Sequence, residues 1–378
     1  MIPFIDLAAQ QKRIRPQIEA AMLRVLDHGG YIMGPEVQAL EDQLSAFCGA
    51  PHTLSCANGT DALALILMAK QVGPGDAVFV PSFTFAATAE VVAWMGATVV
   101  FIDVLPDTFN MDPASLEAGV QKAKKLGLRP SGVIPVDLFG QPADYDAIAS
   151  LAQAHGLWVM ADAAQSFGGT YKGRKVGTLA ESTTTSFFPA KPLGCYGDGG
   201  AVFTESNDLF EVLKSLRVHG QCADGDKYKN IRIGMNGRLD TLQAAILIEK
   251  LEIFPGEIIM RQSIADRYTK GLQDVATVPF VRKDCQSTWA IYTLKVDPLK
   301  RVAIMEGLKE KGVPSVIYYP LPLHRQEAYC AYPCATDSLP VSEALSQTVL
   351  SLPMHPYLEP ETQDFIIQTF RDVVKQIG

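Results

Sequence analysis

The sequence has no block of basic residues and no long apolar run, and each absence excludes a class of protein. Its 41 acidic residues outnumber its 33 basic ones, for a formal net charge of −8, so nucleic acid is not an expected partner. The longest uncharged apolar stretch near the expected strands, residues 91–102, is shorter than the roughly 20 residues of a membrane-spanning helix. The first residues show no apolar core behind a basic head, so we expect no signal peptide, no membrane partner and a cytoplasmic protein.

Cysteine is arranged unlike a disulfide framework or a zinc site. The seven cysteines are an odd number and include no CxxC pair. Cys330 and Cys334 form a CxxxC, but no matching histidines occur at zinc-finger spacing. We therefore expect reduced thiols and no bound metal.

Three common ligand-binding motifs are also missing. The glycine-rich run at 197–203 has the wrong spacing for the GxGxxG of a nicotinamide-dependent oxidoreductase, and it leads into a strand. Gly168 and Gly173 have the spacing of a P-loop, but Arg174 and Lys175 follow where that motif needs Lys and then Ser or Thr. No Gly-x-Ser-x-Gly elbow of a serine hydrolase occurs.

What the sequence does contain is a regular alternation of short apolar runs with helical patterns. This alternation implies crossover connections, and therefore an α/β fold with a mostly parallel sheet. The runs typical of strands are residues 76–81, 98–104, 132–140, 157–165, 183–190 and 200–205. The patterns typical of helices are residues 37–49, 57–70, 86–96, 113–125 and 144–156.

The pattern changes after about residue 250. An amphipathic helix at 240–254 leads into further strand and helix patterns at 287–297, 301–312, 313–323 and 360–378. We therefore expect two domains. Residues 1–250 would form a large domain with the parallel sheet, and residues 251–378 a smaller α+β domain.

Residues of chemical interest follow the expected strands, which is where open α/β sheets bind ligands. Asn58, Gly59 and Thr60 precede an apolar helix, which fits either a phosphate at the helix N-terminus or an ordinary helix cap. Phe85 lies between a strand and a helix, where its ring can stack on a planar ligand or pack into the core. For each residue alone, both interpretations stay open.

Two charged residues occupy unusually apolar positions. Asp162 ends a buried strand and Gln165 follows it; such a carboxylate needs a helix end, a cation or a protonated ring nitrogen to stabilise it. Lys191 follows Ser186 and an apolar run. In a partly apolar pocket a lowered pKa would make this lysine a nucleophile and base, whereas at the surface its amine would reach solvent.

Together these residues specify pyridoxal 5′-phosphate (PLP). The helix N-terminus offers a phosphate site and the aromatic ring can cover a pyridine ring. Asp162 can keep the pyridine nitrogen protonated, and Lys191 can form a Schiff base with the aldehyde and carry protons. All four features lie on different connections of one expected sheet, so their joint occurrence favours a cofactor over four unrelated structural roles.

The chain also resembles a known family. The stretches "NGTDAL", "PSFTFAATA", "ADAAQSFG", "SFFPAKPLG" and "MNGRLDTLQAAIL" are part of a similarity that runs from residue 4 to about 358. They resemble the sugar-nucleotide aminotransferases of the DegT/DnrJ/StrS type. This resemblance implies the aspartate-aminotransferase-like fold (PLP fold type I), with a large domain and a smaller C-terminal one.

The resemblance assigns a role to each residue and adds a partner chain. The family builds each active site across a homodimer, and Asn236 would reach the phosphate in the partner's site. The other cofactor contacts that the resemblance implies are the phosphate with Gly59, Thr60 and Ser186, the ring face with Phe85, the ring nitrogen with Asp162, the 3-hydroxyl side with Gln165, and the Schiff base with Lys191.

A narrower resemblance concerns the substrate. The stretches "RLDTLQAAIL" and "SLPMHPYL" are similar to members that act in O-antigen (lipopolysaccharide) biosynthesis. They imply transamination of UDP-linked 3-keto-N-acetylglucosaminuronate with L-glutamate as the amino donor. Tyr318 stands where many members have a histidine, which leaves the sugar substituent open. The substrate contacts that we expect are Arg238, Tyr318, Tyr319 and His324.

Three other functions fit parts of the pattern. An aminotransferase of the same family would instead act on a 4-keto-6-deoxy or 3-keto-6-deoxy sugar linked to UDP or dTDP. The PLP-dependent sugar dehydratases of the family replace the lysine by histidine, so Lys191 favours transamination. A regulatory protein that only binds the cofactor would not need every catalytic position to be filled.

Overall fold

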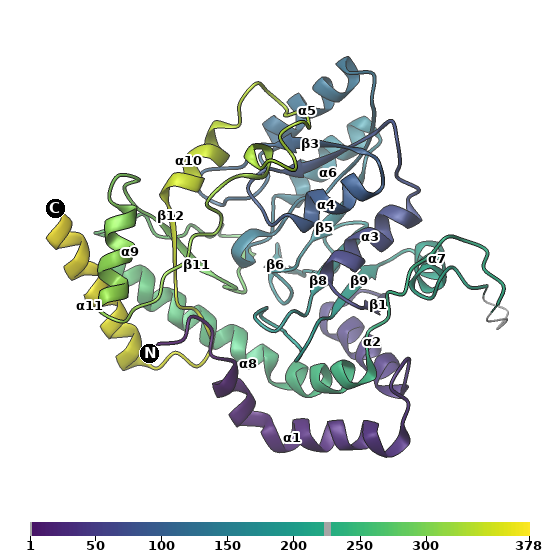
Figure 1. Ribbon diagram of the computed structural model, residues 1–378, viewed down its shortest axis with the longest axis horizontal. Coiled ribbons are helices and arrows are strands. Elements are labelled where there is room, and N and C mark those ends of the chain that lie inside the picture. Colours follow the sequence, from purple (N-terminus) through teal and green to yellow (C-terminus); the bar gives the residue numbers. More distant parts are fainter. Residues whose placement is uncertain (1, 223–227) are drawn as a thin grey trace.

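A seven-stranded sheet forms the centre of the larger part of the protein (Figure 1). The computed structural model describes residues 2–222 and 228–378. In spatial order the strands are β1 (His52–Cys56), β9 (Gly200–Thr204), β8 (Ser182–Ser186), β5 (Trp158–Asp162), β4 (Arg129–Val133), β2 (Asp76–Pro81) and β3 (Thr98–Ile102). Neighbouring strands are parallel except around β9, which is antiparallel to both β1 and β8. The expected α/β fold with a mostly parallel sheet is confirmed.

Helices cover both faces of this sheet. They are α2 (Pro35–Cys48), α3 (Gly59–Ala69), α4 (Ala87–Trp94), α5 (Pro113–Lys125), α6 (Tyr145–His155) and α7 (Asn207–Arg217). The N-terminal helix α1 (Leu7–His28) packs instead on the long helix α8 (Thr241–Leu272), and a short 3₁₀ helix, η1, lies at Leu138–Gly140. All six residues of β2 are buried. Val80 belongs to the core formed with α3 and α4, whereas Phe79 belongs to the core formed with α5 and α6. A strand without a polar side requires such cover on both faces.

The strand directions bring four strand ends together. Because β9 is antiparallel to both of its neighbours, β1 runs in the same direction as β8 and the other parallel strands. The carboxyl ends of β1, β2, β5 and β8 therefore lie at one edge of the sheet, which is where such sheets bind ligands. Cys56 and Ser186, the last residues of β1 and β8, both pair with Gly200.

The C-terminal part is built on a long helix, α8 (Thr241–Leu272), that leads out of the sheet region (Figure 1). Its other elements are α9 (Arg301–Glu310), η2 (Leu323–Arg325), α10 (Pro340–Thr348), α11 (Pro360–Ile377) and the antiparallel strands β11 (Tyr292–Lys295) and β12 (Val349–Leu352). Tyr268, Tyr292 and Phe370 are fully buried in the core of this part. Residue 250 lies within α8, and the division into domains at that position stays a prediction.

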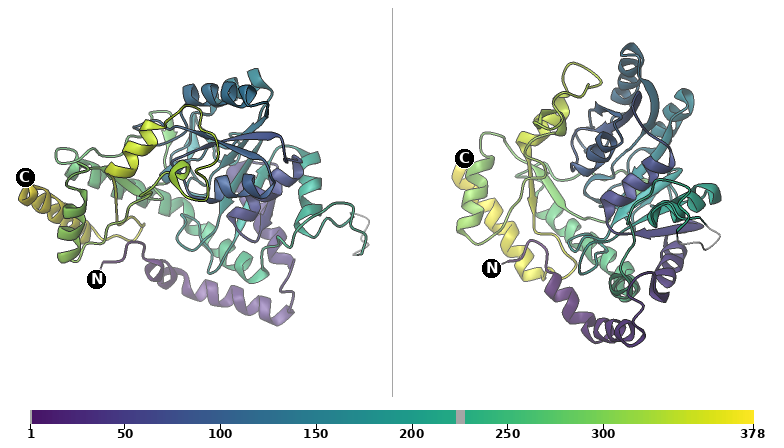
Figure 2. Two further views of the ribbon diagram at one scale, coloured as in Figure 1. Left: turned by 45° about the horizontal axis from the view of Figure 1, so that its top comes forward. Right: turned by 45° about the vertical axis from the view of Figure 1, so that its right-hand side comes forward.

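Several contacts join the parts, among them a small sheet and the N-terminal segment. A small sheet orders β10 (Cys285–Gln286), β6 (Thr170–Tyr171) and β7 (Arg174–Lys175), so the chain after α8 pairs with a hairpin of the sheet region. The N-terminal segment extends to the C-terminal part, where the carbonyl of Phe4 accepts a hydrogen bond from the Met354 amide. Figure 2 shows the N-terminus close to α11.

Two segments differ from the sequence-based expectation. Residues 313–323 form a single bridge, Val316 with Ser351, instead of a strand. This segment contains three prolines, at 314, 320 and 322, which lack the amide hydrogen that a sheet ladder needs. Strand β12 pairs with β11 instead. Strand β1 was not expected from the sequence, because its five residues carry little of the β-branched or aromatic signal.

The remaining features concern membranes and thiols. None of the helices in the described residues combines the length and the apolar character that crossing a bilayer requires. The seven cysteines are unpaired thiols. Within residues 2–222 and 228–378, no three His, Cys, Asp or Glu side chains gather as a metal site would need.

Candidate active site

The predicted cofactor residues lie at one edge of the seven-stranded sheet. Gly59 follows β1, Phe85 follows β2, Asp162 ends β5 and Ser186 ends β8. The parallel directions of these strands bring their carboxyl ends to the same edge. Each side chain therefore comes from a different connection, but all of them border one space.

The turn before α3 has the form of an anion site. Asn58 caps the helix, and its side-chain oxygen accepts a hydrogen bond of 2.8 Å from the Asp61 amide. Gly59 lies against Ser186: a Cβ at position 59 would be 2.7 Å from the Ser186 Cβ. Glycine is therefore required for the close approach, which places a hydroxyl beside the free amide groups of a helix N-terminus. Thr60, the next residue of the helix, is half-buried.

Asp162 is a buried carboxylate held by two donors. It is 6% exposed. The Thr88 hydroxyl on α4 donates to Asp162 Oδ2 at 2.8 Å, and the Ala164 amide donates to Oδ1 at 3.2 Å. Burial raises the pKa of Asp162, whereas Thr88, Ala164 and the amine of Lys191 lower it. These contacts fix the orientation of the carboxylate at the sheet edge.

Removing the Thr88 hydroxyl should therefore weaken the site. We expect Thr88→Val to lower kcat/KM roughly ten- to a hundredfold, because losing a hydrogen bond to a charged group costs about 1.5–3 kcal/mol. Since the hydroxyl lowers the pKa of Asp162, the acidic limb of the pH–rate profile should also move to higher pH. Thr88→Ser keeps the hydroxyl and is the matched control; equal pH profiles for the Val and Ser variants would contradict this assignment.

Lys191 is presented by a closed turn after β8. The turn is stabilised by hydrogen bonds of 2.8 Å from the Lys191 amide to the Phe188 carbonyl and from the Cys195 amide to the Phe187 carbonyl. Burial lowers the pKa of the Lys191 amine, and Asp162 opposes that shift. Among the described residues this amine has no hydrogen-bond partner. It is thus a half-buried amine without a hydrogen-bond partner near a carboxylate, and its lowered pKa leaves more of it in the unprotonated form that acts as a nucleophile or as a general base.

Gln165 connects the site to the chain after α8. Its side-chain oxygen accepts from the Phe139 amide at 2.6 Å, and its side-chain nitrogen lies 3.5 Å from the Tyr319 hydroxyl. The Thr288 hydroxyl donates to the Gln165 carbonyl at 2.7 Å. Burial raises the pKa of Tyr319 well above its usual value, and Asp162 contributes to this shift. Tyr319 therefore stays a neutral donor at the border of the site.

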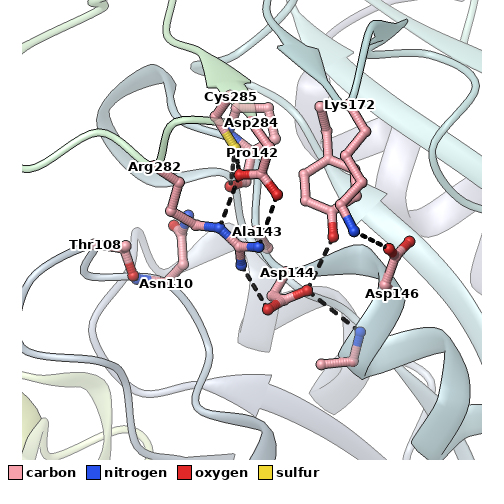
Figure 3. Close-up of polar contacts among 12 residues, drawn as sticks. Thr108, Asn110, Pro142, Ala143, Asp144, Asp146, Lys172, Arg282, Asp284 and Cys285 are labelled. Atoms are coloured by element: carbon pink, nitrogen blue, oxygen red, sulfur yellow. Dashed lines mark hydrogen bonds and ion pairs between the residues drawn. The ribbon is translucent and has the colours of Figure 1, made fainter.

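A polar cluster holds the segment that carries Thr288 (Figure 3). Arg282 forms ion pairs with Asp144 at 2.5 Å and with Asp284 at 3.0 Å. Its amide donates to the side chain of Gln141 at 2.7 Å. Asp144 caps α6 in the sheet region. This cluster therefore attaches the segment after α8 to the sheet region.

Other predicted residues lie at the margin of the site. Phe85 is 60% exposed, so its ring is open to a ligand. Asn236 is exposed, and the next residue, Gly237, accepts a hydrogen bond of 3.0 Å from the amide of Ala57 in the same chain. Arg238 carries a buried Nε atom without a hydrogen-bond partner in the described residues. Their contacts with the cofactor, substrate or a partner chain stay predictions.

The predicted substrate residues Tyr318 and His324 already have protein neighbours. Tyr318 packs edge-to-face on Phe4, with ring centroids 6.3 Å apart. His324 is 7% exposed, with Nδ1 at 2.6 Å from the Ser82 hydroxyl and Nε2 at 3.0 Å from Glu343. Both ring nitrogens of His324 are therefore used within the protein, and a substrate contact would need one of them to be released.

Sequence reasoning missed two supporting side chains. The first is Thr88, which contacts Asp162 as described above, and the second is Asp137. Asp137 accepts hydrogen bonds from the Ser166 hydroxyl at 2.7 Å, the Tyr145 hydroxyl at 2.8 Å and the Ala143 amide at 2.8 Å. Burial raises its pKa to about 7 despite these donors. Its position at the end of an apolar run, like that of Asp162, was the only available sequence signal.

Comparison with known proteins decides the family. A model described as the DegT/DnrJ/EryC1/StrS aminotransferase family matches residues 12–371. The chain belongs to this family. The similarity to aminotransferases that the sequence suggests is thereby confirmed, and the protein is an aminotransferase of the DegT/DnrJ/EryC1/StrS family.

Similar proteins share nearly the whole length of this aminotransferase. The UDP-2-acetamido-2-deoxy-3-oxo-D-glucuronate aminotransferase of Pseudomonas aeruginosa is 49% identical over 360 residues, or 95% of this chain and 96% of the relative. A DegT/DnrJ/EryC1/StrS aminotransferase from Brucella abortus has a TM-score of 0.96 at 49% identity, covering 98% of this chain and 99% of its own. NtdA from Bacillus subtilis, solved with bound cofactor PMP, has a TM-score of 0.91 at 29% identity, covering 99% of this chain and 85% of its own.

Proposed function

We propose that this aminotransferase uses PLP to convert a keto-sugar nucleotide to the amino sugar. The observation that carries the proposal is the unpaired amine of Lys191 near Asp162, at the sheet edge that also holds the Gly59–Ser186 anion site. A phosphate site, a ring-nitrogen partner and a reactive amine in one space match the three polar parts of PLP.

The residues present fit this cofactor. The contact between Gly59 and Ser186 leaves room for a phosphate but not for a side chain at position 59. The amine of Lys191 has no competing partner among the described residues, and Phe85 is exposed enough to cover a ring. When bound here, PLP supplies an aldehyde, which takes up an amino group and passes it on, and a ring, which accepts electrons.

The protein's own groups then position the reactants and move protons. Gly59, Thr60 and Ser186 bind the phosphate and fix the ring, while Asp162 holds a proton at the ring nitrogen. Lys191 Nζ has a lowered pKa, so it can take a proton from the substrate carbon and return it elsewhere. The neutral hydroxyl of Tyr319 and the side chain of Gln165 lie next to each other at the border of the site.

We propose UDP-linked 3-keto-N-acetylglucosaminuronate as the sugar substrate, L-glutamate as the amino donor and a role in O-antigen synthesis in the cytoplasm. The Pseudomonas aeruginosa relative supports the sugar, because it is named for that substrate and matches 95% of this chain. Unpaired cysteines agree with a reducing compartment. Arg238 is the proposed anion-binding residue for the substrate, since its buried Nε atom lacks a partner in the described residues.

A panel of keto-sugar nucleotides tests this substrate. The holoenzyme with glutamate should convert the 3-keto uronate, which carries a C6 carboxylate, with a kcat/KM at least about tenfold above that of its 6-deoxy counterpart. A sugar without the C6 carboxylate loses one buried charge pair with the protein, and this loss lowers kcat/KM about tenfold or more. Preference for a 3-keto-6-deoxy or 4-keto-6-deoxy sugar would support the other sugar class and reject the uronate.

We also propose a homodimer in which Asn236 completes the partner's phosphate site. Mixing Lys191→Ala chains with Asn236→Ala chains should restore about one quarter of wild-type activity. Half of the dimers would then be mixed, and one of their two sites would contain both intact residues. Activity is measured before and after subunit exchange. Because Gly237 also contacts Ala57 within its own chain, no recovery despite proven exchange would place Asn236 in its own chain's site.

A further inference from the structure

A second lysine is buried on the other side of the turn that carries Lys191. Lys250 lies on α8 and is only 1% exposed. Its Nζ atom donates a hydrogen bond of 2.6 Å to the Gly194 carbonyl and lies 4.1 Å from the centroid of the Tyr196 ring. Lysine is rarely buried, because its charge is costly to remove from water. An apolar side chain of the same length would fill this space without that cost.

The carbonyl that Lys250 contacts belongs to the closed part of the turn. Gly194 packs on the backbone just before Lys191: a Cβ at position 194 would be 2.5 Å from the Pro189 carbonyl oxygen. The next residue, Cys195, closes the turn, because its amide donates a hydrogen bond of 2.8 Å to the Phe187 carbonyl. A hydrogen bond to Gly194 therefore restrains both chain segments of the turn at once.

Two other roles for Lys250 agree less well with its surroundings. Burial lowers its pKa to about 8, while Cys195 and Glu257 oppose this shift, so the amine has some nucleophilic character. With 1% exposure, however, no substrate can reach it. Lys250 also does not tune the charge of Lys191, because the pKa of that amine is set by burial, which lowers it, and by Asp162, which opposes this shift. The role that remains for Lys250 is to hold the geometry of the turn.

We propose that Lys250 is a positioning residue that holds the turn of residues 187–195 so that the Lys191 amine points at the cofactor aldehyde. The proposal rests on the proposed role of Lys191. The ammonium of Lys250 crosslinks α8 to the Gly194 carbonyl, and its contact with the face of Tyr196 stabilises the charge in the interior. The two lysines thus act on one turn, Lys191 as the reacting group and the buried Lys250 as its support.

The test compares Lys250→Met with wild type, because methionine keeps the length and packing but removes the donor. In the apoprotein, hydrogen exchange of the Lys191 and Cys195 amides should become roughly tenfold faster, as expected for the loss of one hydrogen bond to a charged group. When PLP is added to this apoprotein to form the holoenzyme, the borohydride-reducible linkage at Lys191 should form roughly tenfold more slowly than in wild type. The kcat should fall with little change in KM, because substrate-binding groups are untouched.

Two further variants make the result specific. Ile264→Val removes one buried methylene from α8 in the C-terminal core, and it should leave both the exchange of these amides and the linkage rate unchanged. Lys250→Gln keeps a donor on a shorter side chain and should recover part of the loss.

Three outcomes would overturn the proposal. Wild-type amide exchange and linkage rate in a folded Lys250→Met protein would show that the donor does not hold the turn. Equal effects in Ile264→Val would show a general loss of stability. If neither Met nor Gln at position 250 folds, Lys250 supports the whole core and not the turn. Failure of the proposed function is distinguishable, because wild type itself would then form no linkage at Lys191.

Discussion

Replacement of Lys191 by alanine is expected to lower kcat by about 10⁴-fold and to abolish the covalent link to the cofactor. Lys191 offers the only unpaired amine that the described residues place beside Asp162, so it has both the nucleophilic and the proton-carrying role. Proton transfer by a positioned group contributes about 10²–10⁴-fold by itself, and loss of the covalent link adds to this. The measurements are the steady-state rate and a mass map of peptides after borohydride reduction.

Two controls accompany this variant. Lys309→Ala removes an exposed lysine on α9, and it should keep wild-type activity and the reducible link. Lys191→Ala should remain folded, because removing a half-buried amine without a hydrogen-bond partner costs little. A reducible cofactor adduct in the Ala variant would show that another lysine forms the link.

The second large effect is expected at Asp162. Asp162→Asn keeps the shape of the side chain but removes its charge, so the ring nitrogen would lose its proton and the ring its capacity to accept electrons. We expect kcat to fall about 10²–10⁴-fold, the range that corresponds to the roughly 3–5 kcal/mol associated with breaking a buried charge pair. The half-reaction with glutamate should slow by a similar factor, which rapid-mixing absorbance measures.

The stability of the Asp162→Asn apoprotein separates this effect from misfolding. Burial raises the pKa of Asp162, so the folded state binds this proton more tightly than the unfolded state does. The resulting stabilisation is present at low pH and is lost as pH rises through the raised pKa. Asn carries no charge to bury, so the apoprotein should be at least as stable as wild type at neutral pH. A variant that is both inactive and markedly less stable would contradict a charge-specific role.

The positions of Asp162 and Lys191 in the fold could be predicted from the sequence because each follows a short apolar run, and Gly59 stood out because it begins an apolar helix. A parallel sheet gathers the ends of such runs at one edge, and the structure confirms the mostly parallel sheet. The catalytic roles proposed for these residues follow from that placement and from the family to which the chain belongs.

The supporting contacts could not be predicted in the same way. Thr88 is 74 residues from Asp162 in sequence, and Lys250 is 56 residues from Gly194. Hydrophobic periodicity indicates which face of a helix is buried, but not which carbonyl or carboxylate a polar side chain on that face will meet. Lys250 in particular is one of several charged positions in an amphipathic helix, and its burial depends on how α8 packs against the turn after β8.

The contacts of His324 could not be predicted either. A substrate contact for His324 stays a prediction, and the structure places its ring nitrogens against Ser82 and Glu343. These contacts attach η2, which follows the proline-rich segment, to the end of β2 and to α10. The sequence carries no sign of them, because Ser82 is 242 residues away.

Transfer of nitrogen-15 from labelled glutamate tests the central claim most directly. The holoenzyme is incubated with nitrogen-15 glutamate and the UDP-linked 3-keto uronate, and the sugar product is analysed by mass spectrometry. The account predicts one labelled amine per sugar, with an equal amount of 2-oxoglutarate. A deoxy sugar that gains no amine, as a dehydratase would form, or an absence of label in every keto-sugar nucleotide of the panel, would contradict it.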